Sequence, residues 1–342
     1  MMNYFVYADG LLGLATEERS FDWSYGTHAP SADRAAFDAC RVRIHLSVVP
    51  DRAVFDPTVK REDFCSFGSF FTRADQTTLY YEKHLFAGVS LRFALLIENE
   101  TEVHLTVGKT YLNAVRMRVM NLHALRYVLF DLASALLLRQ GFLTLYASAV
   151  FFPKQQRSVL CFGSPGSGKT LAALRLCREN DADYISEDLV FTDGTTLYGV
   201  PHTASYRPET ARKAKQVGTL VSEVRRNTKK RDKEAFGIER VAQSAPATDL
   251  FLLQKGTENG ADPDCYGRIC ALNRYLLHYH RSPVLLALAY RDPSFSPTLL
   301  EEREEHILQT LLEHTSSSVL TETDPALFPQ RILQALAEDP TV

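Results

Sequence analysis

The sequence predicts an α/β protein in which a P-loop domain follows a smaller, mostly β N-terminal module. Three observations lead to this prediction. A glycine-rich loop stands between an apolar strand-like run and a helical run within residues 158–176. Short runs with period-two alternation recur through residues 1–118, and leucines at helical spacing fill residues 121–139. We therefore expect a β module over 1–120 and a P-loop domain over 121–342, joined by the helix at about 121–139.

Length and composition are typical of one large or two modest globular domains. The 342 residues are 45% hydrophobic and 23% charged, and the net charge of −3 gives no electrostatic reason to expect a nucleic acid partner. The N-terminal run lacks the basic and apolar regions of a signal peptide. Because the six cysteines form no C-x₂-C pair, we expect buried free thiols in a reducing cytoplasm.

Alternating runs predict the strands of the N-terminal module. They are found at residues 41–47, 91–97 and 102–107, and turn signals separate them. The module is therefore expected to be a small β structure.

The leucine-rich run at 121–139 predicts a helix that ends at Gly141, a plausible left-handed C′ residue. Its most apolar part, 122–138, is short, and Arg126 and Asp131 interrupt it. The run therefore favours an amphipathic helix of a soluble protein over a membrane span.

The P-loop domain is expected to alternate strands and helices. Apolar runs predict strands at 143–152, 158–162, 184–191 and 248–253. Helical periodicity follows the glycine-rich loop and recurs at 298–314 and 327–337.

The glycine-rich loop matches the pattern G-x-x-x-x-G-K-[ST] with Gly163-Ser164-Pro165-Gly166-Ser167-Gly168-Lys169-Thr170. Its glycines permit backbone angles and close approaches that a Cβ would block, so that N–H groups can surround a phosphate. The following helix adds the positive end of its dipole. Lys169 would reach the β- and γ-phosphates, and Thr170 would bind Mg²⁺. The loop thus predicts binding of ATP with Mg²⁺.

An acidic pair one helix downstream supplies a second group for phosphoryl transfer. Glu187 and Asp188 follow the apolar residues Tyr184 and Ile185. In a doubly wound sheet, ligands gather at the carboxyl ends of the strands, which would bring this pair beside the loop. One carboxylate could accept a proton while the other addresses the metal.

These motifs, in this order, resemble the kinase domain of the HPr kinase/phosphorylase family. The similar stretch runs from about 143 to 193 and includes a small-residue strand motif at 146–150, the P-loop and the acidic pair. The segment 199–209 resembles short relatives of that kinase, some of which phosphorylate peptides in natural-product gene clusters. The resemblance implies transfer of the γ-phosphoryl of ATP to a hydroxyl of a peptide or small protein.

By position, the resemblance makes Glu187 the base that takes the proton from the acceptor hydroxyl, with Lys169 and Asp188 also catalytic. Thr170 and Asp188 would hold Mg²⁺. Members of the family often form rings, which leaves a homo-oligomer open.

The chain departs from the family by having Glu187 where Asp is usual and Tyr146 where His is usual. A tyrosine is a poor base near pH 7 because its pKa is about 10, which argues against phosphorylase activity and bears on kinase activity too.

Two further features are predicted at lower specificity. Arg207 follows the acidic strand and could clamp a phosphate. The segment 212–233 is the most basic of the chain and is either a solvated surface or a lid near phosphates. His278 and His280 are read as residues of a helix, in which their side chains would diverge, and not as a metal pair.

Three functions remain compatible with these motifs. The first is a Mg²⁺-dependent kinase acting on a Ser or Thr hydroxyl of a peptide or small protein. The second is an ATPase or a kinase of a small molecule such as a sugar or an amino acid. The third is a non-catalytic nucleotide-binding module that recruits a partner, which the replacement at Tyr146 keeps open.

Overall fold

The computed structural model describes residues 1–18, 31–73, 77–86, 88–116, 125–200, 240–256, 265–277 and 281–338. Within these ranges the chain is a mixed α/β protein with three sheets. Contacts divide it into two compact units. Unit 1 comprises Met1–Ser24, Ala29–Gly141 and Tyr279–Arg303, and unit 2 comprises Tyr25–His28, Phe142–His278 and Glu304–Val342.

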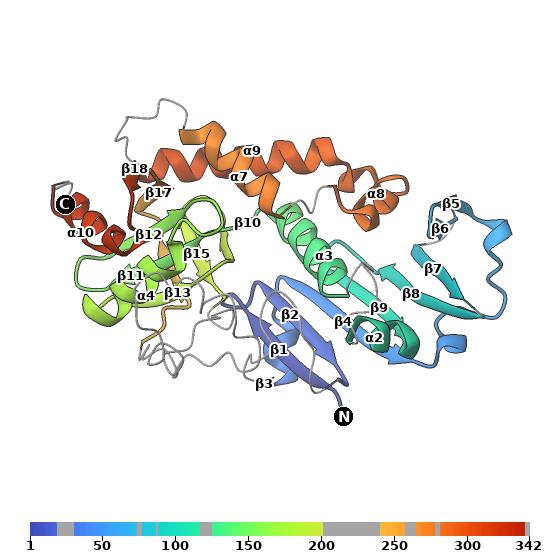
Figure 1. Cartoon of the computed structure of the whole chain (residues 1–342). Helices are drawn as coiled ribbons and strands as arrows, with labels where there is room; N and C mark the ends of the chain where they lie inside the picture. Colours follow the sequence, from blue (N-terminus) through green and yellow to red (C-terminus); the bar gives the residue numbers. More distant parts are fainter. Residues whose placement is uncertain are drawn as a thin grey trace. The chain divides into compact units, whose positions relative to one another are not determined.

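Unit 1 is built on a nine-stranded sheet (Figure 1). From one edge to the other its strands are β3 (Ser31–Ala32), β1 (Asn3–Tyr7), β2 (Leu12–Thr16), β4 (Val42–Val49), β9 (Glu102–Gly108), β8 (Val89–Ile97), β7 (Thr78–Phe86), β6 (Phe70–Thr72) and β5 (Cys65–Phe67). The three runs predicted as strands are β4, β8 and β9. Alternate residues of β4 and β9 are buried, as period-two patterning requires.

Short helices flank this sheet. They are α1 (Arg34–Asp38), α2 (Lys109–Arg116), α3 (Leu125–Arg139) and α8 (Pro283–Ala289), with 3₁₀ turns η1 (Asp51–Ala53), η2 (Arg61–Asp63) and η6 (Pro293–Phe295). Helix α3 contacts β4 and α8. These contacts place α3 in unit 1, so the division between the units follows Gly141 and not residue 120 as expected.

Helix α3 differs from the amphipathic helix that the sequence predicts. Every residue from 128 to 138 is buried, because α3 is covered on all sides and not on one stripe. Asp131 is buried with them, and burial raises its pKa to about 7. Gly141 has a φ of 86°, the left-handed conformation expected of it. Among the described residues, none of the helices combines the length and apolar composition needed to cross a membrane.

Unit 2 contains two smaller sheets. The five-stranded sheet has the order β13 (Asp183–Ser186), β11 (Ser148–Phe152), β12 (Arg157–Phe162), β17 (Asp249–Lys255) and β18 (Ser316–Glu322). The four-stranded sheet has the order β10 (Leu143–Leu145), β14 (Val190–Thr192), β15 (Thr196–Gly199) and β16 (Ser244–Pro246).

Two runs predicted as single strands are each broken in two, which corrects the prediction. The run at 143–152 becomes β10 and β11, and the run at 184–191 becomes β13 and β14. In each case the chain leaves one sheet of unit 2 and enters the other, since β10 pairs with β14 and β11 pairs with β13. Apolar composition persists across both breaks because both sheets are buried, so periodicity carried no signal of the change.

Helices cover the five-stranded sheet. Helix α4 (Lys169–Glu179) contacts β11, β12 and β13, and α10 (Phe328–Glu338) contacts α4 and β18 (Figure 1). Their apolar residues form a shared core with the strands, which includes Cys161 and Phe328. The remaining helices are α7 (Cys265–Leu277) and α9 (Pro297–His314), with the 3₁₀ turn η7 (Pro325–Leu327), and the division between the units falls within α9.

The six cysteines all carry free thiols. Cys161 and Cys177 pack in the core of unit 2, and burial raises the pKa of each to about 12. Cys65 is exposed, which corrects the expectation that the thiols are buried, because the edge strand β5 carries it outside the sheet core.

Candidate functional site

The strand directions of unit 2 bring three predicted segments to one edge of the five-stranded sheet. Strand β11 runs antiparallel to both of its neighbours, so β12 and β13 point the same way. The glycine-rich loop follows β12, and Glu187 and Asp188 follow β13. Tyr146 lies two residues before Ser148, the first residue of β11, which pairs with Cys161 near the end of β12. Ligands collect at such carboxyl ends of strands in open α/β sheets.

The loop between β12 and α4 depends on glycine at two positions. Gly163 has a φ of 153°, and a Cβ there would lie 2.5 Å from Ser167 Oγ and 2.6 Å from the carbonyl oxygen of Leu253 on β17. Gly168 has a φ of 106° and precedes α4, where a Cβ would lie 2.7 Å from Pro325 Cβ. Neighbouring backbone and a proline ring therefore exclude any larger residue at both ends of the loop.

The rest of the loop is divided between solvent and core. Ser164, Pro165 and Gly166 are exposed, whereas Ser167 is buried. The Ser167 hydroxyl makes no hydrogen bond to any residue that the structure describes. Thr170 lies half-buried in the first turn of α4.

The side chain of Lys169 turns back into the loop. Its Nζ donates hydrogen bonds to the carbonyl oxygens of Gly163, at 2.6 Å, and Ser164, at 3.2 Å. The side chain is buried, and burial lowers the pKa of Lys169 from 10.5 to about 8, although the nearby Asp188 carboxylate opposes the shift. The ammonium group of Lys169 is thus held inside the loop, where burial disfavours its charged form.

The acidic pair lies in a tight turn. The Leu189 N–H donates to the carbonyl oxygen of Glu187 at 2.7 Å, and Asp188 between them has a φ of 65°. A hydrogen bond that spans one residue with positive φ defines a strained γ-turn. The Ser186 hydroxyl supports the turn from inside by donating to the Leu189 carbonyl oxygen at 2.6 Å. Glu187 is fully buried and Asp188 is half-buried.

Tyr146 contacts the lysine and lies within the electrostatic influence of the acidic pair. Lys169 Nζ is 4.7 Å from the centre of the Tyr146 ring, a cation–π contact. Burial, with smaller contributions from the charges of Asp188 and Glu187, raises the pKa of Tyr146 to about 12. The phenol therefore stays neutral at physiological pH and cannot serve as a base there.

The backbone of Tyr146 is held by a residue that the sequence analysis did not identify. Asn273 on α7 accepts a hydrogen bond from the Tyr146 N–H at 2.9 Å and donates to the Thr144 carbonyl oxygen at 3.1 Å. Its amide also donates to the buried carboxylate of Glu304 at 3.2 Å. Asn273 thereby satisfies the backbone where the chain passes from β10 to β11. An asparagine in a helical run carries no such signal in the sequence.

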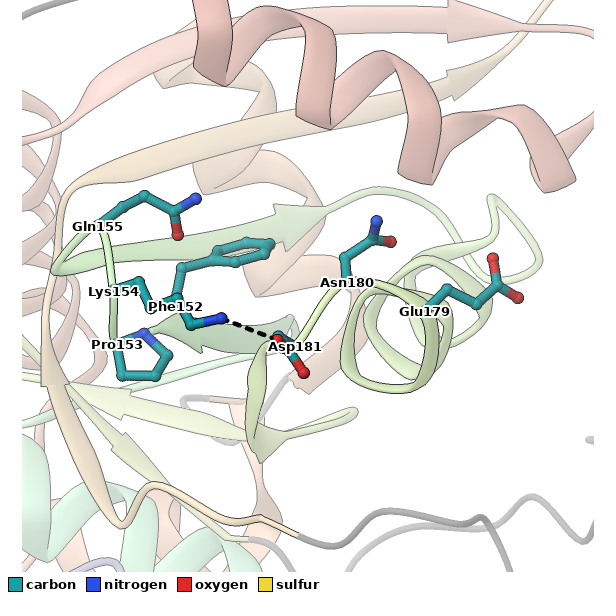
Figure 2. A pocket seen from close by; sticks show the side chains of 7 residues that line it. All are labelled: Phe152, Pro153, Lys154, Gln155, Glu179, Asn180 and Asp181. Carbon is teal, nitrogen blue, oxygen red and sulfur yellow. Dashed lines mark hydrogen bonds and ion pairs between the residues drawn. The ribbon is translucent and has the colours of Figure 1, made fainter.

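Unit 2 also contains a hollow of about 260 Å³ (Figure 2). Its lining comes from the end of β11 and the end of α4, and comprises Phe152, Pro153, Lys154, Gln155, Glu179, Asn180 and Asp181. Lys154 and Asp181 form an exposed ion pair of 3.0 Å across it. Because β11 is antiparallel to β12, these residues stand at the opposite edge of the sheet from the glycine-rich loop.

Three features discussed from the sequence fall outside the described residues. They are Arg207, the basic segment 212–233, and the histidines His278 and His280. The described part of the site thus consists of the glycine-rich loop, Lys169, Tyr146 and the acidic pair. Neither a family model nor a curated protein matches this chain.

Proposed function

We propose that unit 2 is a P-loop domain that transfers the γ-phosphoryl group of ATP to a Ser or Thr hydroxyl of a peptide or small protein. The observation that carries this proposal is the meeting of Lys169, Tyr146 and the Glu187–Asp188 turn at one sheet edge. A polyphosphate site and a pair of carboxylates are the two components that phosphoryl transfer to a hydroxyl requires.

The loop fits a triphosphate. Gly163 has no Cβ, which lets the loop pass close to Ser167 Oγ and the Leu253 carbonyl oxygen, and the buried Ser167 hydroxyl has no hydrogen-bond partner among the described residues. The N-terminus of α4 faces the same loop, and its dipole favours anions. Lys169 would exchange its two carbonyl contacts for phosphate oxygens. Thr170 and Asp188 would hold Mg²⁺, whose charge neutralises the phosphates when it is bound.

In the proposed reaction the acceptor hydroxyl oxygen attacks the γ-phosphorus and the bond from that phosphorus to the β,γ-bridging oxygen breaks. ADP leaves, and the hydroxyl proton passes to Glu187. Lys169 offsets the charge that builds up on the transferring group. Asp188 is the more exposed of the two carboxylates and the one whose charge acts on Lys169.

The test is incubation of the purified chain with γ-labelled ATP, Mg²⁺ and a library of Ser- and Thr-containing peptides. We expect label on a peptide hydroxyl, loss of transfer in Lys169→Ala, and at least a 100-fold loss of turnover with retained ATP binding in Glu187→Gln. Glu179→Gln, at the far end of α4, is the matched control and should transfer normally. Intact ATP binding with no transfer to any hydroxyl would overturn the proposal.

A further inference from the structure

The second candidate site of the molecule is in unit 1, on the central strands of its nine-stranded sheet. Strands β4 and β9 are parallel neighbours, and their register pairs His45 directly with His104. Glu102 lies two residues before His104 and so shares its face of the sheet. The alternate residues of both strands, among them Ile44 and Val103, are buried on the other face.

The two imidazole rings are stacked and nearly parallel. Their ring centroids are 4.4 Å apart and their planes differ by 4°. Nε2 of His45 is 2.8 Å from Glu102 Oε1, and Nε2 of His104 is 3.9 Å from the same oxygen. One ligand atom from each of the three residues lies within 4.8 Å of the others. Two imidazole nitrogens and a carboxylate oxygen therefore lie close enough together to serve as ligands of one ion.

These separations suit a tetrahedral metal ion. Bonds of about 2.0–2.1 Å at the tetrahedral angle place two ligand atoms about 3.3 Å apart, which lies between the two nitrogen-to-oxygen distances at Glu102. Small side-chain rotations would therefore equalise them. All three side chains are partly exposed, so an ion can reach them from solvent.

The neighbours of the cluster orient its carboxylate. Arg43 Nη2 lies 2.7 Å from Glu102 Oε2, the oxygen that does not face the histidines. This contact fixes Glu102 with Oε1 toward the imidazoles, an arrangement that resembles the outer hydrogen bonds of metal sites. Phe37 packs edge-on against His45 at 5.1 Å and limits rotation of that ring. Glu98 Oε2 lies 2.6 Å from His104 Nε2 and offers a further carboxylate.

We propose that His45, Glu102 and His104 bind Zn²⁺, with water or Glu98 in the fourth position, and that the ion ties β4 to β9. Two imidazoles and a carboxylate are a ligand set that Zn²⁺ uses. Strands β4 and β9 join the β3–β1–β2 and β8–β7–β6–β5 parts of the sheet. A metal at their junction therefore links segments that are 57 to 59 residues apart in the chain. This site is independent of the reaction proposed for unit 2.

The test is titration of the full-length, EDTA-dialysed protein with Zn²⁺ by calorimetry, and with Co²⁺ as a spectroscopic probe. We expect one ion per chain, d–d absorption of a tetrahedral site, and no thiolate-to-cobalt charge-transfer band. His104→Gln and His45→Gln should each weaken binding by at least about 100-fold, more than loss of an outer partner costs. His84→Gln, an exposed histidine on β7 of the same sheet, is the matched control and should bind normally.

A direct measurement on the unmodified protein tests the site even if the variants fail to fold. X-ray absorption of the zinc-loaded chain should show a shell of nitrogen and oxygen at about 2.0–2.1 Å with imidazole scattering. The apparent melting temperature of the loaded protein should also rise with free Zn²⁺. A sulfur shell, or unchanged zinc affinity in the His45→Gln/His104→Gln double variant, would overturn the proposal.

Discussion

The ammonium group of Lys169 lies 4.7 Å from the centre of the Tyr146 ring. The two residues come from different elements, since Lys169 begins α4 and Tyr146 connects β10 to β11. Through this contact the Tyr146 ring can stabilise the lysine charge while its phenol stays protonated. The aromatic face holds a cation that burial disfavours.

Replacing the Tyr146 ring is expected to weaken ATP binding. Tyr146→Leu removes the aromatic face, and a cation–π contact contributes about 0.5–2 kcal/mol, so affinity should fall by about 2- to 30-fold. Tyr146→Phe keeps the face and should bind within about twofold of the parent. Fluorescent ATP titration measures both. An equal loss in the two variants would assign the effect to the hydroxyl and contradict the cation–π role.

Gly163→Ala should abolish nucleotide binding, because its Cβ would meet the Leu253 carbonyl oxygen at 2.6 Å and Ser167 Oγ at 2.5 Å. Gly141→Ala is the matched control. Its φ of 86° is also left-handed, but a Cβ there has no neighbour within 4 Å. That variant should cost about 1 kcal/mol of stability and leave ATP affinity unchanged. Thermal denaturation and ATP titration of both proteins check this difference.

ATP binding should be linked to proton uptake above about pH 8. The pKa of Lys169 is lowered to about 8, so the free protein has lost part of this charge at pH 8.5. Anionic phosphates favour the protonated lysine and raise its pKa, so binding takes up a proton and affinity falls as the pH rises. Calorimetry at pH 8.5 in buffers of different ionisation enthalpy measures the uptake.

Lys169→Arg provides the contrast for this pH effect. A guanidinium stays charged throughout the range, so its variant should show no linked uptake at pH 8.5. Proton uptake that is the same in the variant and the parent would show that another group is responsible.

The buried ion pair between Arg157 and Asp249 should be a major support of unit 2. Arg157 Nε donates to Asp249 Oδ2 at 2.9 Å, its Nη2 pairs with the other oxygen, and its Nη1 donates to the Leu336 carbonyl oxygen at 3.0 Å. Asp249→Ala strands a largely buried guanidinium and should cost about 3–5 kcal/mol. Lys154→Ala breaks the exposed pair with Asp181 and should leave the unfolding midpoint close to that of the parent, because exposed ion pairs contribute little. Urea denaturation compares the two.

The buried Asp131 should make unit 1 less stable as the pH rises. Its pKa is raised from 3.8 to about 7, so between these values the folded chain holds a proton that the unfolded chain has released. Stability therefore falls as the pH rises from about 4 to 7 and stays lower above that range. Asp131→Asn removes this fall and should stabilise the protein at pH 8 by up to about 4 kcal/mol, taking about 1.36 kcal/mol per pKa unit.

Denaturation midpoints at pH 5 and pH 8 distinguish the buried carboxyl from a general charge effect. The exposed Glu100→Gln should change the free energy of unfolding by less than about 0.5 kcal/mol at both pH values. A gain in Asp131→Asn that is equal at the two pH values would contradict the assignment.

Local pattern was sufficient for the elements that flank the glycine-rich loop. The run at 158–162 is within β12, the helix after the loop is α4, and the helices predicted at 298–314 and 327–337 are α9 and α10. Each of these elements keeps one hydrophobic period along its length and has a clear boundary in the sequence. The same reasoning missed the breaks at Tyr146 and Glu187, because a strand that passes from one buried sheet to another remains apolar throughout.

The chemistry available to the protein is evident from local sequence: a loop whose glycines permit close approach, a lysine, and two adjacent carboxylates one helix later. Folding sets which of these groups act on each other. It put the Tyr146 ring against Lys169, supplied Asn273 from 127 residues away to hold the Tyr146 backbone, and paired His45 with His104 across parallel strands. Local periodicity reports whether a residue is buried, whereas its partner is set by strand order and register, which only the folded chain defines.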